Sequence, residues 1–96
     1  MRGFTVVHAP SVEDDVACAV GYYRKISSNL ADTFLSQLRE ATSYLEQFPL
    51  AFAKRHGEVR AVSLRQFPHR IHFIVEEHQQ LVVVISVMNT HRESAS

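Results

Sequence analysis

Hydrophobic residues follow a helical spacing in the first half of the chain and a strand-like alternation in the second half. Residues 4–8 are short, β-branched and aromatic, which predicts a first strand. The apolar positions of residues 12–23 and 30–48 recur at steps of three and four, which predicts two amphipathic helices. Only residues 27–29 separate them, so the helices should form an antiparallel hairpin that ends at Pro49.

Polar residues beside the two apolar stripes predict where the helices begin. Ser11 is expected to cap the first helix, with acidic side chains in its first turn near the positive end of the helix dipole. Asn29 and Asp32 resemble a capping pair for the second helix. Gly21 costs about 1 kcal/mol relative to alanine inside a helix. We expect it to allow a close approach of the second helix.

From residue 58 onward the hydrophobic period changes from 3.6 to 2, which predicts strands. A basic loop over residues 50–57 should precede a first alternating strand at 58–65. Phe67-Pro68 reads as a turn or bulge, because proline cannot donate to a central ladder. A second strand is expected at 71–75. After a polar hairpin loop, the run 81–88 is apolar on both faces, as in a central strand.

This order of elements predicts an α+β domain: an N-terminal strand, a helical hairpin and a three-stranded antiparallel meander, with both helices on one face of the sheet. Residues 1–96 should form one domain, with 89–96 as a short polar tail. The longest apolar run, 81–87, is too short to cross a bilayer, and the start of the chain lacks the apolar core of a signal peptide. The lone Cys18 has no partner for an internal disulfide. We therefore expect a cytoplasmic protein.

The charge is balanced overall but unevenly distributed. Residues 1–48 hold four basic and six acidic side chains, whereas residues 49–96 hold six basic and four acidic side chains. Within 54–72 the balance is five basic residues to one acidic residue. A local basic field attracts anionic partners such as RNA, DNA or an acidic peptide. We expect the sheet face opposite the helices, with its flanking loops, to carry these groups.

Five short motifs follow one another along residues 3–92. They are Tyr22-Tyr23, the segment 29–35 that opens the second helix, Phe48-Pro49, the segment Leu64-x-x-Phe67-Pro68-His69-Arg70-Ile71, and Asn89-Thr90-His91-Arg92. This ordered set resembles the RelE/ParE superfamily of toxins from type II toxin–antitoxin systems, and it is most similar to the ParE branch. The final motif resembles the family's common His-Arg-Arg ending, with one arginine missing.

The resemblance implies a function and a partner. ParE-like toxins are associated with inhibition of DNA gyrase, whereas RelE-like toxins cut mRNA in the ribosome. Both are neutralised by an antitoxin whose flexible C-terminal segment wraps the toxin, which implies a hetero-oligomer and no cofactor. The leading hypothesis is a ParE-like toxin that inhibits gyrase by binding. The alternatives are a ribosome-dependent mRNA endonuclease and a family member of low toxicity that serves as a binding partner of its antitoxin.

The candidate site residues are cations of the second half. RNA cleavage needs a base, cations beside the phosphate and an acid, and the catalytic candidates are Arg65, Arg70 and His91. RelE-like proteins often have a tyrosine near the C-terminus, and this chain has none after Tyr44. Arg70 is also suited to a structural role at the Phe67-Pro68 turn. Candidates for contact with the target or antitoxin are Lys54, Arg55, Arg60, Arg65, Arg70, His91 and Arg92.

The six histidines do not predict a metal site. His69 and His72 lie three residues apart in a predicted strand, so their side chains should point to opposite faces. The other histidines lack the spacing of metal ligands.

Overall fold

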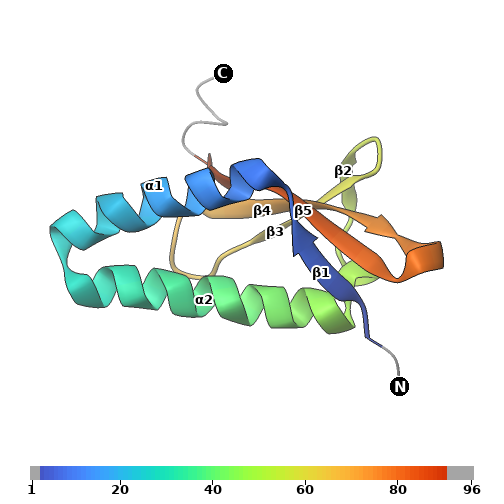
Figure 1. Cartoon of the computed structure of the whole chain (residues 1–96), viewed down its shortest axis with the longest axis horizontal. Helices are drawn as coiled ribbons and strands as arrows, with labels where there is room; N and C mark the ends of the chain where they lie inside the picture. The colour runs from blue at the N-terminus through green and yellow to red at the C-terminus, as the bar shows by residue number, and fades with distance from the viewer. Residues whose placement is uncertain (1–2, 91–96) are drawn as a thin grey trace.

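Two helices cover one face of a five-stranded sheet in the computed structural model, which describes residues 3–90 (Figure 1). The sheet order is β1-β5-β4-β3-β2, in which β1 runs parallel to β5 and the other neighbours are antiparallel. The elements are β1 (Thr5–His8), α1 (Pro10–Ile26), α2 (Ser28–Gln47), the 3-10 turn η1 (Pro49–Ala51), β2 (Lys54–His56), β3 (Val59–Ser63), β4 (His69–Glu76), the 3-10 turn η2 (Glu77–Gln79) and β5 (Leu81–Asn89).

The α+β fold class predicted from the hydrophobic spacing is confirmed. α1 and α2 form the expected hairpin, with Ser27 alone between them (Figure 1). The antiparallel part of the sheet has one strand more than predicted, because residues 54–56 of the expected basic loop form the short edge strand β2. β5 lies between β1 and β4, which explains why most of its residues are apolar; Ser86 and Asn89 are the polar ones.

The core lies between the helical hairpin and the sheet. Phe34 and Leu45 of α2 are fully buried against Phe73 of β4 and Val82 of β5, together with the other core side chains. Burial of each such side chain contributes about 1.5–3 kcal/mol. The register that places Phe73 opposite Val84 also contains a bulge between His72 and Phe73, which keeps the apolar residues of β5 on the helix side.

The first helix begins one residue earlier than the predicted cap. Its N-cap is Ala9 and its first residue is Pro10, whose fixed φ and missing N–H suit the start of a helix. The predicted cap at Ser11 is therefore wrong. Farther along, the Asp15 carboxylate does not remain in solvent at the helix start, because it accepts a hydrogen bond from the Val87 N–H at 3.0 Å. This contact ties α1 to the part of β5 that extends past β1.

The second helix also begins at a different residue from the one predicted. Ser27 is its N-cap, and the Ser27 Oγ accepts a hydrogen bond from the Leu30 N–H at 3.0 Å. The expected capping pair of Asn29 and Asp32 is wrong, because Asn29 already lies inside the first turn. Ser27 thus ends one helix and caps the next, which allows a one-residue connection.

Gly21 does not mediate the expected close approach of the helices. A Cβ atom built on Gly21 meets no heavy atom within 4 Å, and the residue is exposed. The hypothesis about its packing role is wrong, and its cost to the helix has no compensating contact in the described structure. None of the helices in residues 3–90 is long and apolar enough to cross a membrane.

Candidate functional site

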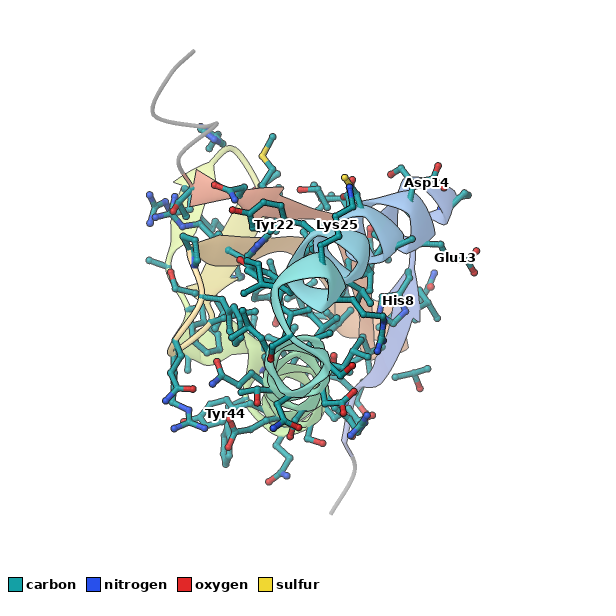
Figure 2. All side chains as sticks on the ribbon, turned by 90° about the vertical axis from the view of Figure 1, so that its left-hand side faces the viewer. His8, Glu13, Asp14, Tyr22, Lys25 and Tyr44 are labelled. Atoms are coloured by element: carbon teal, nitrogen blue, oxygen red, sulfur yellow. The ribbon has the colours of Figure 1, made fainter. Side chains whose placement is uncertain are left out.

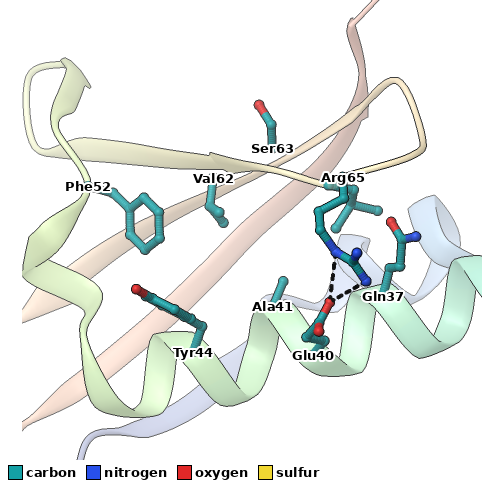
Figure 3. A pocket seen from close by; sticks show the side chains of 9 residues that line it. Gln37, Glu40, Ala41, Tyr44, Phe52, Val62, Ser63 and Arg65 are labelled. Carbon is teal, nitrogen blue, oxygen red and sulfur yellow. Dashed lines mark hydrogen bonds and ion pairs between the residues drawn. The ribbon is translucent and has the colours of Figure 1, made fainter.

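An open groove of about 370 Å³ lies between α2 and β3 (Figure 3). We call it the α2–β3 groove. α2 supplies one wall, and the segment that follows η1 and the end of β3 supply the other. Its lining residues are Gln37, Glu40, Ala41, Tyr44, Phe52, Val62, Ser63, Leu64 and Arg65. A volume of this size lies within the range of ligand and peptide pockets.

One end of the groove is aromatic and open to solvent. The Tyr44 ring centroid lies 5.8 Å from that of Phe52 and 5.4 Å from that of Phe48. Tyr44 and Phe48 are each about half exposed, at 51% and 53%. The Phe52 ring in turn meets the buried Phe73 edge-on, at 6.1 Å. A row of rings therefore runs from the core to the surface, and its outer members have apolar area without a protein cover.

The opposite end of the groove is polar and firmly positioned. Gln37 is only 5% exposed, and its side-chain amide donates to the Gln66 Oε1 at 2.7 Å. The Gln66 N–H donates back to the Gln37 Oε1 at 3.1 Å. This reciprocal pair holds the segment that carries Arg65. The Arg65 Nη2 and Nε lie 3.2 Å and 3.3 Å from a single oxygen, Glu40 Oε1 (Figure 3).

The floor of the groove is bordered by an incomplete sheet edge. β2 pairs with β3 only through Lys54 opposite Arg60 and His56 opposite Val59. Within residues 3–90, no strand follows β3 on this side past Arg60. The backbone of residues 61–63 therefore presents a strand edge beside the groove. Such an edge is a template for pairing with another chain.

The predicted basic residues are divided among several surfaces. Lys54 forms an ion pair with Glu58 at 3.0 Å, and Arg55 is exposed on β2. Arg60 is opposite the core residue Phe73, and its Nη1 donates to the Phe52 carbonyl at 2.7 Å. Arg60 therefore points to the helix side. The expectation that the basic groups lie on the face opposite the helices and in its flanking loops is wrong for Arg60, whose side chain lies on the helix side. Arg65 does lie in the loop after β3, but its side chain turns toward Glu40 of α2.

Arg70 and His72 lie on the helix-free face of the sheet, because they alternate with the core residues Ile71 and Phe73. The His72 Nδ1 lies 3.2 Å from the Oγ of Ser86, its direct partner in the register. Arg65 lies in the α2–β3 groove on the other side. The structure therefore does not bring the catalytic candidates Arg65 and Arg70 together, and His91 and Arg92 lie outside the described residues.

A buried polar pair fixes the junction between the hairpin and β4. The Tyr23 hydroxyl lies 3.0 Å from the His69 Nε2, and the two side chains are 6% and 5% exposed. Burial lowers the pKa of His69 below its usual value of 6.5 and raises that of Tyr23. His69 packs against Phe34 on the helix side, so it does face away from His72. This pair makes the Phe67-Pro68-His69-Arg70 segment a structural junction.

The groove residues of α2 were missed in the sequence because they lie beside the core stripe. Gln37, Ala41 and Tyr44 follow at helical spacing and form a second row next to Phe34 and Leu45. The aromatic side chain of Tyr44 in this row was the feature of the sequence that could have indicated a second functional face of the helix. Among residues 3–90, no group of three histidine, cysteine or acidic side chains is placed to hold a metal ion.

Most of the chain matches the model of a single protein family. The model for the ParE toxin of the type II toxin–antitoxin system parDE matches residues 6–93. The chain belongs to the ParE toxin family. This confirms the superfamily and branch indicated by the sequence motifs. No curated protein sequence matches the chain.

Solved structures share the fold of this ParE-family chain. The chromosomal ParDE toxin–antitoxin system of P. aeruginosa contains a chain with a TM-score of 0.75 and 16% identity, over 90% of this chain and 95% of that one. The RelBE2 toxin–antitoxin complex of Mycobacterium tuberculosis contains a chain with a TM-score of 0.60 and 17% identity, over 93% of this chain and 93% of that one. At these identities the likeness shows the fold, which confirms the RelE/ParE-like architecture.

Proposed function

We propose that this ParE-family chain is a toxin that inhibits DNA gyrase by binding and is neutralised by a cognate antitoxin. The family match carries the proposal, because the matching model describes the toxin of the parDE type of toxin–antitoxin system. The similar solved structures are described as toxin–antitoxin assemblies, which supports an antitoxin partner and a hetero-oligomer. The proposed setting is the cytoplasm, and the proposed activity requires no cofactor.

The α2–β3 groove is the proposed docking site for the antitoxin. It combines the exposed ring of Tyr44, which has Phe48 as its neighbour outside the groove, with the strand edge of residues 61–63. A flexible segment can add a strand at such an edge and insert alternate side chains into the adjacent groove. Arg65 and the basic strand β2 flank the site, so an acidic segment would complement it.

The distribution of cations supports a binding toxin more than a ribosome-dependent endonuclease. Arg65 and Arg70 lie on opposite sides of the sheet, so a single phosphate would not meet both. RNA cleavage also needs a positioned base and acid at one phosphate. Gyrase inhibition by binding places no such requirement on the site, because a surface that is complementary to the target suffices.

Two parallel assays test the proposed function. Purified protein is added to a gyrase supercoiling reaction and, separately, to translating ribosomes whose mRNA is mapped by primer extension. We expect loss of supercoiling with intact mRNA. If the mRNA is cut at fixed positions within codons and supercoiling stays normal, the chain is an endonuclease and not a gyrase inhibitor. Absence of both effects, together with normal growth on expression, would assign the chain to the low-toxicity alternative.

A matched pair of variants locates the antitoxin contact. The candidate antitoxin is the small acidic protein expected from a neighbouring reading frame, produced together with the chain. Arg65→Gln in the groove should weaken this complex. Lys25→Gln, in the exposed last turn of α1 and away from the groove residue Tyr44 (Figure 2), should leave it unchanged. Equal affinity of both variants would remove the groove from the antitoxin interface.

A further inference from the structure

We propose that the α2–β3 groove receives an extended segment with a large apolar side chain and a carboxylate two residues apart. We propose further that Glu40 holds the place of this carboxylate until the partner binds. The inference rests on the proposed function, in which the groove receives the antitoxin. It goes beyond that function because it specifies the chemistry of the occupant and identifies a competitor within the toxin itself.

The apolar half of the occupant follows from the aromatic end of the groove. Tyr44, Phe52 and Val62 line this end, and Tyr44 keeps half of its surface exposed. Exposed aromatic side chains beside a groove are typical anchors of protein interfaces. A large apolar side chain inserted between α2 and β3 would cover these rings and extend the row that reaches the core at Phe73.

The carboxylate half follows from the geometry of the Arg65–Glu40 pair. Both contacts from the guanidinium reach the same oxygen, Glu40 Oε1. A bidentate pair, in which two N–H groups meet two oxygens, is stronger and more specific. The side chains of Arg65 and Glu40 are 68% and 61% exposed, so the existing pair contributes little to folding. A partner carboxylate that uses both of its oxygens can therefore replace Glu40.

The spacing of the two groups follows from the strand edge. Alternate residues of an extended segment lie on one face and are separated by about 6.6 Å along the strand. A segment paired with residues 61–63 would direct residues i and i+2 toward the groove wall formed by α2. One of them would face Tyr44 and the other would reach Arg65, which lies just past the end of β3.

The charges around the groove favour this occupant over a neutral one. Arg65 lines the groove, and Arg60 lies next to its Phe52 wall, where the Arg60 Nη1 donates to the Phe52 carbonyl. Lys54 and Arg55 lie on the neighbouring strand β2. Glu58 and Glu40 already lie against Lys54 and Arg65. Each acid thus screens a base that an acidic partner would otherwise meet. Removal of Glu40 should uncover Arg65 and tighten the binding of a carboxylate.

A pair of small probes tests this chemistry without the antitoxin. 3-Phenylpropionate carries a ring and a carboxylate, and 3-phenylpropanamide is its neutral counterpart. Both are titrated into the protein, and binding is followed by NMR shifts of Tyr44, Phe52 and Arg65. We expect the acid to bind with a dissociation constant of about 1 mM, as is typical for a fragment of this size, and the amide to bind more weakly.

Two variants should change binding of the acid in opposite directions, and a third serves as a control. Glu40→Gln should tighten binding of the acid about two- to fivefold, and Arg65→Gln should weaken it by at least as much. Neither should alter binding of the amide. Glu46→Gln, another exposed acid on α2 that does not line the groove, is the control and should have no effect. Melting temperatures confirm that each variant is folded.

The outcomes separate this inference from the proposed function. Equal binding of acid and amide, or no tightening in Glu40→Gln, would overturn the exchange of carboxylates. If sedimentation shows that the chain self-associates and that the acid blocks this association, the occupant of the groove is a second copy of the chain and not the antitoxin. An antitoxin that binds equally well to all variants, while the fragment behaves as expected, would contradict the proposed antitoxin site and leave the groove chemistry intact.

Discussion

Removal of the Tyr23 hydroxyl should destabilise the protein because its partner, His69, is confined to the core. The hydroxyl lies 3.0 Å from the His69 Nε2, and within the described structure the His69 Nδ1 has no hydrogen-bond partner. Tyr23→Phe therefore leaves both ring nitrogens of a buried histidine without a protein partner. The expected loss is about 1–3 kcal/mol in the free energy of unfolding. For a domain of this size, each kcal/mol lowers the melting temperature by about 4–8 °C.

The double variant tests the reasoning more sharply than the single change. His69→Phe alone leaves the Tyr23 hydroxyl unpaired, so it should also cost stability. Tyr23→Phe together with His69→Phe removes both polar groups and keeps rings beside Phe34 and Phe67. Its loss should be smaller than the sum of the single losses by about 1 kcal/mol or more. Urea unfolding monitored by circular dichroism at pH 7.5 measures all four proteins, and additive effects would refute the argument.

The same pair predicts a pH dependence of stability. Burial places the pKa of His69 in the folded state below its usual value of 6.5. The unfolded chain therefore binds more protons at this residue, and stability increases with pH across the interval between the two values. This contribution is complete above about pH 6.5 and is lost as the pH falls toward the folded-state pKa. His69→Phe should flatten this part of the profile, and an unchanged slope would contradict the assignment.

Three further substitutions test the packing. Gly21→Ala should stabilise the protein by about 0.5–1 kcal/mol in urea unfolding, because the helix gains propensity and the new Cβ meets nothing within 4 Å. Gly3→Ala should destabilise it by about 1 kcal/mol, because its Cβ would lie 2.9 Å from the Glu46 carbonyl oxygen; an unchanged melting temperature would argue against this contact. Gln37→Ala should cost about 1–2 kcal/mol and increase amide hydrogen exchange at Gln66, because both hydrogen bonds of the pair are lost. Exchange at wild-type rates would show that Gln37 does not hold this segment.

The elements dominated by apolar periodicity were predictable from the sequence. The α2 stripe that includes Phe34 and Leu45 predicted a helix with the correct buried face, and the largely apolar run of β5 predicted a central strand. The helix starts were less predictable, because several polar residues near each start are suitable caps. Ser27 and Asn29 are both suitable caps, and it is the Ser27 Oγ that accepts the hydrogen bond from the Leu30 N–H. β2 was missed because its sequence, Lys-Arg-His, has no apolar alternation at an exposed edge.

Of the residues that line the α2–β3 groove, Arg65 is the one that the sequence singled out. The sequence indicated that Arg65 is available for a partner, and the structure places it at the mouth of a groove. Its pairing with Glu40 and its support by Gln37 depend on how α2 lies against β3, which no local pattern specifies. The Tyr23–His69 hydrogen bond joins residues 46 positions apart, and it likewise depends on how α1 lies against β4. Contacts between elements were therefore the part that required the fold.

The position of β5 in the sheet determines when the chain can finish folding during its synthesis. Within residues 3–90, β1 pairs with β5 alone and β4 lies on the other side of β5, so β5, the last described strand in chain order, joins both parts of the sheet. During synthesis from the N-terminus, β1 must wait for its strand partner because β5 has not yet been made, and pairing between such distant segments is slow in addition. The helical hairpin can form earlier from local contacts. The complete sheet should therefore form only after β5 is made, and a nascent chain that stops before β5 lacks the strand that joins β1 to β4.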